Sequence, residues 1–336
     1  MACSTHTNPK ASPIGAGPRK AWVIDLDGVV WLSGEPIAGA GEAVQRLLNA
    51  GIGVLLCSNN SSPSHSQYAD RLLRAGIDPA RVDLVSSADS AASLVQPGDR
   101  VLALGGDGLY EALEKRGARV ILPGLQAPLD GLSDPENAID AVVVGFDQDF
   151  NFYRLTVAQR AVRAGAKLIG TNEDVTHPTP SGLVPGTGAV LAAVAAASET
   201  TPVVAGKPHE PIVDLIRARL PEHCQVEMVA GDRLATDGKL AERIGAPFGF
   251  VRSEVNCPPS WQGSAETQHI GSRPDSRHIG SRPSESQPGD QRRLPADPAG
   301  STVHPLGSDR SGAGGPIDLE APSLAVLVEM ALSRAS

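Results

Sequence analysis

Residues 21–31 read AWVIDLDGVVW, and this stretch decides how the rest of the chain is interpreted. An apolar run ends at Ile24, and Asp25 and Asp27 follow it, separated by one residue, before Gly28. Apolar β-branched residues that stop at a turn predict a short buried strand. In open α/β sheets, ligands bind beyond the carboxyl ends of the strands, and residues two apart in an extended segment point to the same side. We therefore expect both carboxylates to share one site at the mouth of a sheet.

The two carboxylates repel each other unless a cation lies between them or one of them is protonated. A hard divalent cation such as Mg²⁺ meets the first condition, since it binds carboxylates, water and phosphate oxygens. A division of roles meets the second, because an ionised Asp can attack as a nucleophile while a protonated neighbour acts as general acid. By itself, DLDG also fits a strand that ends in a solvated Asp-Gly turn. Partners elsewhere in the chain must decide between these interpretations.

The composition indicates room for one large or two ordinary domains, with 336 residues of which 41% are hydrophobic. A net charge of −9 argues against a nucleic-acid partner. The four cysteines show no paired spacing, which favours reduced thiols over disulfides or a zinc site. Apolar runs fall short of the roughly 18 residues that span a bilayer, and residues 1–19 lack the apolar segment of a signal peptide. We expect a disordered leader at 1–19, no membrane association and a cytoplasmic location.

Strand and helix patterns alternate along the chain, which predicts a parallel sheet with right-handed crossovers. Strands are expected at 21–24, 53–57, 100–104, 118–122, 139–144, 167–170, 201–205, 226–230 and 248–251. Helices are expected at 41–50, 63–75 (with Ser62 as N-cap), 108–116, 152–164, 189–197 and 211–220, and in a segment ending at 244. The segment THPTPSGLVPGTG at 176–188 is expected to be a loop.

Residues 253–316 differ in character from the rest of the chain. They are rich in Pro, Gly, Ser and Arg, and they contain HIGSRP twice, at 269–274 and 278–283. Such a segment buries too little apolar surface to offset the entropy of ordering it. We interpret it as a disordered insertion, after which a final core helix follows at 324–330.

Polar side chains of complementary kinds follow three further strands. SNNSS at 58–62 offers hydroxyl, amide and backbone N–H donors to a phosphate, Lys207 follows the strand at 201–205, and Asp232 and Asp237 follow the next one. Taken singly, these are a polar loop, a solvated lysine and turn residues. Together with the first motif they supply a nucleophile, metal ligands, hydrogen-bond donors and a cation, which phosphoryl transfer requires. The sequence therefore predicts a phosphoryl-transfer site.

Two other kinds of phosphate site are excluded. Cys57 precedes the polar loop, but the residue six positions later is Pro63, whereas a cysteine-phosphatase loop needs Arg there, so we assign Cys57 no nucleophilic role. The glycines near 105–108 and 182–188 form neither GxGxxG nor a P-loop and are interpreted as turns.

The constellation resembles the haloacid dehalogenase superfamily of phosphatases, and more closely its NagD-like or p-nitrophenylphosphatase branch. The matching motifs are DLDGVVW at 25–31, SNNSS at 58–62, VPGTGAV at 184–190, AGKP at 205–208 and GDRLATD at 231–237. The resemblance implies an α/β fold with a Rossmann-like parallel sheet core, helices on both faces and an inserted α/β C2-type cap domain. The core would comprise residues 20–90, 201–252 and 317–336, and the cap residues 91–200.

The resemblance also implies roles for individual residues. Asp25 would be the nucleophile that forms an aspartyl-phosphate, and Asp27 would protonate the leaving group and then activate water. Ser58 would bind the phosphoryl group with support from Asn59. Lys207 would neutralise charge on the nucleophile and the phosphate.

Magnesium would be held by Asp25, by the backbone carbonyl of Asp27 and by Asp232, with Asp237 orienting these ligands. Gly238 and Lys239 depart from the branch pattern and are expected to weaken the start of the following helix. The expected cleft-lining residues of the cap are Asn172, Glu173, Asp174 and the loop at 179–188.

The function that follows is a Mg²⁺-dependent phosphatase acting on a small phosphorylated metabolite. Relatives with such a cap act on phosphoglycolate, glycerol phosphate, pyridoxal phosphate, nucleotides and sugar phosphates, and a homodimer through the cap is implied as well. A phosphomutase or phosphotransferase would use the same residues and stays open. A binding protein that kept this fold without turnover is a further alternative, although no catalytic position is missing.

Overall fold

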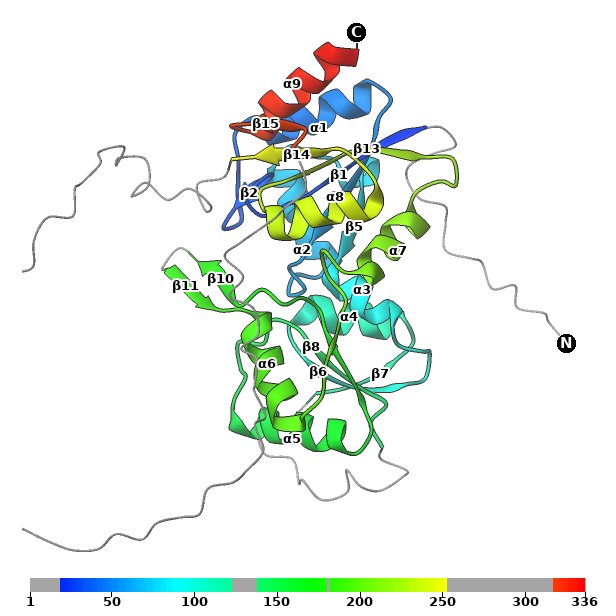
Figure 1. Cartoon of the computed structure of the whole chain (residues 1–336), viewed down its shortest axis with the longest axis vertical. Helices are drawn as coiled ribbons and strands as arrows, with labels where there is room; N and C mark the ends of the chain where they lie inside the picture. Colours follow the sequence, from blue (N-terminus) through cyan, green and yellow to red (C-terminus); the bar gives the residue numbers. More distant parts are fainter. Residues whose placement is uncertain (1–18, 123–137, 180–181, 253–316, 336) are drawn as a thin grey trace, which may run out of the picture.

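The computed structural model describes residues 19–122, 138–179, 182–252 and 317–335. Two parallel sheets with flanking helices form two halves, drawn one above the other in Figure 1. This is the parallel α/β architecture that the alternating pattern predicts, with the Rossmann-like core that the resemblance implies. The expected leader, apart from residue 19, and the expected insertion at 253–316 lie outside the described residues.

The upper half contains a six-stranded sheet in the order β15-β14-β13-β1-β4-β5, in which all neighbours run parallel. Side chains of the central strand alternate between two cores: Trp22 and Ile24 face one, and Ala21 and Val23 face the other. Because both faces are covered, the strand is apolar from Ala21 to Ile24, after the exposed Lys20. The strands are β1 (Lys20–Ile24), β4 (Gly53–Ser58), β5 (Asp83–Ser86), β13 (Gln225–Gly231), β14 (Phe248–Val251) and β15 (Leu319–Ala321).

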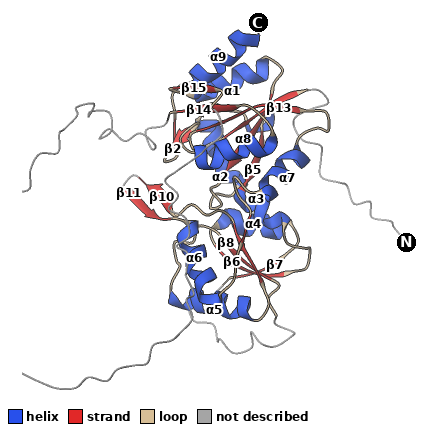
Figure 2. Cartoon of the chain, in the orientation of Figure 1, coloured by secondary structure: helices blue, strands red, loops and turns tan. Residues whose placement is uncertain are grey.

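Helices cover both faces of this sheet (Figure 2). On one face lie α1 (Ala40–Asn49), α2 (His65–Arg74) and α9 (Leu324–Ala335). On the other lie α7 (Glu210–Arg219) and α8 (Lys239–Ile244). The carboxyl edge of the sheet stays uncovered by these helices, so side chains that follow the strands can meet there.

The lower half is built on a five-stranded parallel sheet in the order β12-β9-β8-β6-β7. Its strands are β6 (Arg100–Leu104), β7 (Arg119–Ile121), β8 (Ala141–Val144), β9 (Lys167–Gly170) and β12 (Val203–Val204). Helices α5 (Phe152–Arg163) and α6 (Thr187–Ser198) pack on one face, and α3 (Ser87–Ser93) and α4 (Asp107–Lys115) on the other. Helix α3 and strand β12 thus pack with this half; of their residues, we had assigned 87–90 and 203–204 to the core and 91–93 to the cap.

The loop after β4 joins the two halves by direct contact. The N–H of Gly108 donates to the Ser62 carbonyl at 2.8 Å, and the Thr171 hydroxyl donates to Ser61 Oγ at 3.1 Å. A Cβ at position 108 would lie 2.1 Å from the Pro63 carbonyl oxygen, so only glycine allows this approach. The polar loop is therefore packed against the lower half rather than open to solvent.

The segment 176–188 was expected to be a loop, and that prediction was wrong. It contains an antiparallel hairpin of β10 (Thr176–Thr179) and β11 (Gly182–Pro185), which projects toward the upper half in Figure 1. Prolines at 178 and 185 hid the strand pattern, since proline lacks an N–H, but a two-stranded ribbon has open edges that tolerate it. The short β2 (Trp31–Leu32) and β3 (Glu35–Pro36) form a second hairpin that we did not predict.

The start of α2 also differs from the expectation. The N-cap is Ser64, not Ser62, because Ser64 Oγ accepts the Gln67 N–H at 3.2 Å while Gln67 Oε1 accepts the Ser64 N–H at 2.9 Å. This reciprocal capping box satisfies two helix-end donors and fixes the helix start two residues later. Strands β5 and β15 were missed because each is only a few residues long.

Within the described part of the chain, no helix is both long enough and apolar enough to cross a membrane.

Candidate active site

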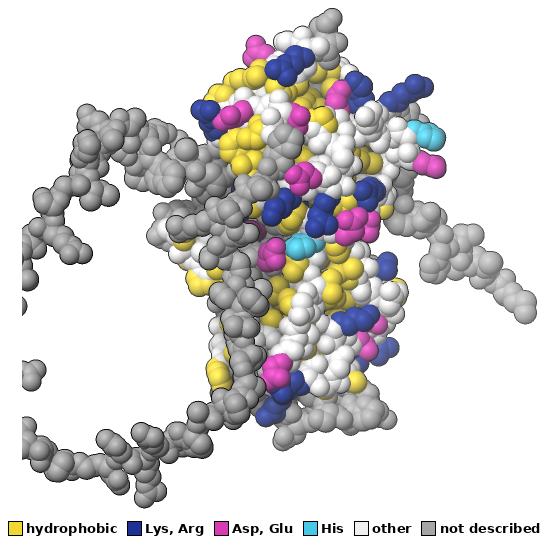
Figure 3. All heavy atoms as spheres, viewed as in Figure 1, with side chains coloured by type: hydrophobic (Ala, Val, Ile, Leu, Met, Phe, Trp, Pro, Cys, Tyr) yellow, Lys and Arg dark blue, Asp and Glu magenta, His cyan; other side chains and the backbone are white. Residues whose placement is uncertain are grey.

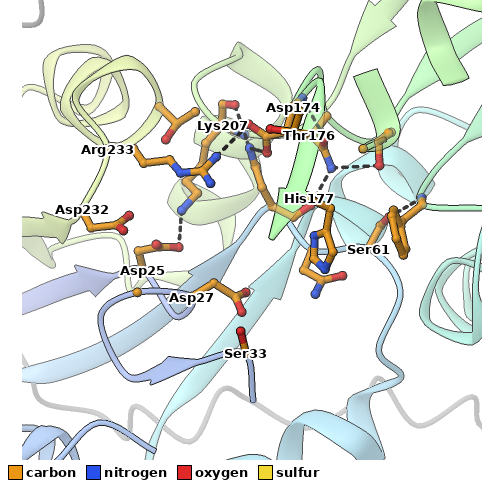
Figure 4. Close-up of a pocket in the computed structure, with 18 of the residues that line it drawn as sticks. Asp25, Asp27, Ser33, Ser61, Asp174, Thr176, His177, Lys207, Asp232 and Arg233 are labelled. Carbon is orange, nitrogen blue, oxygen red and sulfur yellow. Dashed lines mark hydrogen bonds and ion pairs between the residues drawn. The ribbon is translucent and has the colours of Figure 1, made fainter. Parts of the chain in front are cut away.

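Asp25 and Asp27 lie just beyond the end of β1, on a turn that the backbone closes with its own hydrogen bonds. The Asp25 N–H donates to the Ala230 carbonyl of β13 at 2.9 Å, so strand pairing continues to this residue. The Leu26 carbonyl then accepts N–H groups from all three residues at 29–31. As a result, both carboxylates lie at the carboxyl edge of the sheet and line one cavity (Figure 4).

The Lys207 ammonium is buried between two carboxylates. Its Nζ donates to Asp25 Oδ1 at 2.6 Å, to Asp237 Oδ1 at 2.7 Å and to the Cys57 carbonyl at 3.1 Å. All three N–H donors of the ammonium therefore have acceptors, and the side chain is held in one position. Burial raises the pKa of the Cys57 thiol to about 12, so the thiol is protonated at neutral pH and is no nucleophile.

Burial and neighbouring charges set the ionisation of this cluster. Burial raises the pKa of Asp25 well above its usual range; Lys207 opposes the shift, and the carboxylates of Asp237 and Asp232 add to it. Burial disfavours the charged form of Lys207, but Asp237 and Asp25 outweigh it and hold the pKa of the ammonium well above its usual value. The lysine is therefore charged, and it bonds two of three closely spaced carboxyl groups, those of Asp25, Asp232 and Asp237.

Carboxylate oxygens of Asp25, Asp232 and Asp237 lie within 4.8 Å of one another. Both oxygens of Asp237 are already engaged, Oδ1 by Lys207 and Oδ2 by the backbone N–H of Arg233 at 3.1 Å. Asp25 and Asp232 line the cavity and Asp237 does not, so the first two are the carboxylates best placed to bind a cation there. An all-oxygen donor set of this kind suits a hard divalent cation.

Gly231 is required by the position of Asp237. The short π-helical turn Leu234–Gly238 brings Asp237 back against the end of β13. A Cβ at position 231 would lie 2.3 Å from both Cβ and Cγ of Asp237. The glycine therefore permits the carboxylate to reach Lys207.

We expect Gly231→Ala to lower the free energy of unfolding by about 1–3 kcal/mol, because the new methyl group overpacks a site that cannot relax. Phosphate release should fall too, since Asp237 must move away from Lys207. Urea unfolding measures the first effect.

Gly238→Ala is the matched control, because its Cβ would make only ordinary contacts at 3.6 Å with Leu234 and Phe248. It should match the wild type or gain up to about 1 kcal/mol. Equal losses in both variants would contradict this account of Gly231.

Asn59, in the polar loop after β4, fixes the backbone of Lys207 with two hydrogen bonds. Asn59 Oδ1 accepts the backbone N–H of Lys207 at 2.8 Å, and Asn59 Nδ2 donates to the backbone carbonyl of Lys207 at 3.2 Å. Ser58 is buried, and its Oγ accepts the Asn60 N–H at 3.0 Å. Asn59, Asn60 and Ser61 line the cavity, whereas Ser58 is not among its lining residues. The phosphate contact of Ser58 therefore stays a prediction.

A cavity of about 250 Å³ lies over the aspartates, between the two halves. On the face drawn in Figure 3, acidic, basic and histidine side chains gather in the band where the two halves meet. Of the three cap candidates, Asn172 and Asp174 line the cavity, and Glu173 does not. Glu173 Oε1 instead lies 3.0 Å from His209 Nε2. Asn172 also ties the halves together, since its Nδ2 donates to the Asn59 carbonyl at 2.7 Å.

Two prominent residues of the cavity were missed from the sequence, Arg233 and His177. Arg233 Nη1 lies 3.3 Å from Asp174 Oδ1, which makes an ion pair across the two halves. The His177 ring lies 4.6 Å from the Phe146 ring, and burial lowers the pKa of the imidazole. The position of Arg233 directly after a predicted metal ligand was a usable signal. His177 carried none, because the hairpin that presents it was not predicted.

The arrangement supplies the parts of a phosphoryl-transfer site. A buried carboxylate lies beside a fixed ammonium, a second carboxylate follows two residues later, and oxygen ligands for a divalent cation adjoin them. The surrounding cavity limits access of water, which strengthens electrostatic interactions inside it.

Comparison with known protein families gives two matches. Residues 22–119 match the haloacid dehalogenase-like hydrolases, and residues 204–275 match a second profile of HAD-like hydrolases. These segments contain Asp25, Asp27, Ser58, Lys207 and Asp232.

Individual relatives agree with the family match. The acid sugar phosphatase of Staphylococcus saprophyticus is 37% identical over 197 residues, which cover 58% of this chain and 71% of the relative. The glycerol phosphate phosphatase of Mycobacterium tuberculosis, solved in complex with magnesium, is 32% identical with a TM-score of 0.59, over 72% of this chain and 70% of that one. A putative NagD protein is 26% identical with a TM-score of 0.59, over 75% of this chain and 92% of that one.

Proposed function

The chain belongs to the haloacid dehalogenase-like hydrolases, in their NagD-like branch, and we propose that it hydrolyses a small phosphomonoester by phosphoryl transfer to Asp25 with Mg²⁺ as cofactor. The observation that carries this proposal is the Asp25 carboxylate held at 2.6 Å from a buried lysine, with Asp27 in the same cavity. Such a cation stabilises the charge that develops on the nucleophile and the phosphoryl oxygens.

In the first step, an Asp25 oxygen attacks phosphorus while the bond between phosphorus and the ester oxygen breaks. The proton of Asp27 passes to that leaving oxygen, so an alcohol departs and Asp25 carries the phosphoryl group. In the second step, Asp27 takes a proton from water, and the water oxygen attacks phosphorus. The bond to Asp25 then breaks, which releases phosphate, restores the Asp25 carboxylate and leaves Asp27 protonated for the next cycle.

Magnesium would be held by Asp25, Asp232 and the backbone carbonyl of Asp27. Bound there, it would neutralise charge on the phosphoryl oxygens. Asp237 would orient these ligands indirectly, since Lys207 and the Arg233 N–H occupy its oxygens. Three closely spaced carboxyl groups support this assignment, because a divalent cation would offset both the burial and the repulsion from Asp237 and Asp232 that raise the pKa of Asp25.

The phosphoryl group would also be bound by the loop at 58–62. Ser58 would contribute its hydroxyl, and Asn59 would act by fixing the backbone of Lys207, to which it is bonded at both its amide oxygen and its nitrogen. This division agrees with the general rule that rigid supporting contacts set the precision of a catalytic group.

We infer that the substrate is a glycerol phosphate or a small sugar phosphate. The phosphatases named above support this class. Side chains of Thr176, His177 and Thr187 line the cavity on the cap side and can bond hydroxyl groups.

A panel assay tests the proposal. Inorganic phosphate release should be measured from glycerol phosphate, sugar phosphates, phosphoglycolate, pyridoxal phosphate and a nucleotide, with Mg²⁺ and with a chelator. We expect release from a polyol phosphate that the chelator abolishes and that added Mg²⁺ restores. Undiminished activity in chelator would contradict the metal assignment. Transfer of phosphate to a second sugar, without release, would instead identify a phosphomutase or phosphotransferase.

A further inference from the structure

The side chain of Trp31 donates its indole N–H to Asp27 Oδ1 at 3.0 Å. We propose that Trp31 is a positioning residue that commits Oδ1 of Asp27 to this bond and so presents Oδ2 to the leaving group. The inference rests on the proposed function, in which Asp27 is the general acid of the first step.

The backbone holds the two residues together independently of their side chains. The Gly28 N–H donates to the Trp31 carbonyl at 2.7 Å, and the Trp31 N–H donates to the Leu26 carbonyl at 3.1 Å. Asp27 and Trp31 also pair as an isolated β-bridge. The tryptophan thus follows the aspartate across a closed turn, and its indole reaches back to the carboxylate.

Packing keeps the indole from moving. Trp31 is 0% exposed and lies in the main core of the upper half. Its ring centre is 6.2 Å from that of Tyr68 on α2. The Tyr68 hydroxyl in turn donates to the Asn60 carbonyl at 2.6 Å, in the loop next to Lys207. Asp27 is therefore oriented by a chain of contacts that runs from Trp31 through Tyr68 to the polar loop at 58–62.

The orientation matters because a carboxyl group has two chemically equivalent oxygens. A carboxyl free to rotate would present the proton on either oxygen and at a range of angles, whereas proton transfer needs one short, aligned contact. Among the described residues, the indole is the hydrogen-bond partner that the structure gives to this carboxylate. Because the indole N–H is a donor only, Oδ1 of Asp27 serves as its acceptor and the carboxyl proton resides on Oδ2. From Oδ2 this proton passes to the leaving oxygen as the phosphorus–oxygen bond breaks.

The test compares two tryptophans of the same core. Trp31→Phe removes the N–H that reaches Asp27. Trp22→Phe is the matched control, since Trp22 is 1% exposed in the same core and its Nε1 has no hydrogen-bond partner among the described residues. For each variant, kcat/KM is measured with glycerol phosphate, whose alkoxide leaving group needs a proton, and with p-nitrophenyl phosphate, whose phenolate does not. This parameter reports the steps up to release of the alcohol or phenol.

We expect Trp31→Phe to lower kcat/KM for glycerol phosphate by on the order of 10²-fold, the cost of a misplaced catalytic group. The value for p-nitrophenyl phosphate should stay within a few-fold of wild type. Trp22→Phe should leave the ratio of the two substrates unchanged. Equal losses on both substrates in Trp31→Phe would overturn the proposal and leave Trp31 a packing residue.

Two further variants separate the possible failures. If Trp31→Phe does not fold, site-specific replacement of Trp31 by β-(3-benzothienyl)alanine keeps the shape of the ring without its N–H, and the same substrate ratio should change.

Asp27→Asn tests the underlying function. If wild type and Asp27→Asn hydrolyse glycerol phosphate equally well, the proposed role of Asp27 fails, and the role of Trp31 fails with it. If only Asp27→Asn is impaired, the inference about Trp31 alone is wrong.

Discussion

Replacement of Asp25 by asparagine should reduce phosphate release by at least about 10⁴-fold, a loss typical of removing a nucleophile. Asparagine has the same shape, so its carboxamide oxygen can still accept the Lys207 ammonium that now bonds Asp25 at 2.6 Å. The amide cannot form an aspartyl-phosphate. Release should be measured with the best substrate of the panel and with Mg²⁺ present.

The fold should survive this change. Lys207 keeps its bond to Asp237 at 2.7 Å, and the variant loses the repulsion that Asp237 and Asp232 exert on residue 25. Unfolding by urea should therefore require at least the wild-type concentration. Asp214→Asn, on the exposed surface of α7, serves as the control for a general effect of removing a carboxylate. Substantial residual activity in Asp25→Asn would show that another group is the nucleophile.

Replacement of Lys207 by methionine should have the second large effect, on stability as well as on activity. The ammonium is 3% exposed and bonds two buried carboxylates, so its removal leaves Asp25 and Asp237 without their cation. Removing one partner of a buried ion pair costs about 3–5 kcal/mol. The unfolding free energy should fall by that amount, and phosphate release by about 10²–10³-fold, since a cation that stabilises the transition state is lost.

A double-mutant cycle separates the charge effect from the loss of packing. Asp237→Asn in the Lys207→Met background removes one uncompensated carboxylate and should recover part of the stability, so the two changes should be strongly non-additive. Lys167→Met, at the exposed start of β9, should change stability by no more than about 0.5 kcal/mol. If the changes in unfolding free energy caused by the substitutions at 207 and 237 are additive, the ion pair does not contribute the expected energy.

The arrangement of the motifs was accessible from the sequence because parallel strands impose it. Polar residues that directly follow apolar strands must meet at one edge of the sheet when the strands run parallel. This reasoning brought Asp25, Asp27 and Asp232 together, and the structure places all three around one cavity with Lys207. Lys207 follows β12, which belongs to the five-stranded sheet, so the packing of the two halves, and not a shared sheet edge, brings the lysine to the aspartates.

The fine structure of the site was not accessible in that way. Ser58 is the last residue of β4, one position beyond the expected strand end, and its hydroxyl is turned to the backbone N–H of Asn60, which no spacing rule anticipates. Glu173 and Asp174 are neighbours in the chain, but only Asp174 lines the cavity. Side-chain direction within a loop depends on what packs against the loop, and for this loop that is the other half of the molecule.

The sequence by itself determined the alternating α/β architecture, the NagD-like motifs and the meeting of Asp25, Asp27 and Asp232, since each of these depends on local periodicity or on strand ends. Tertiary structure alone decided that Asn59 clamps Lys207 across 148 residues, that a hairpin presents His177, and that Arg233 pairs with Asp174. These contacts join segments far apart in the chain. Their geometry follows from how the two halves pack, and no local pattern encodes that packing.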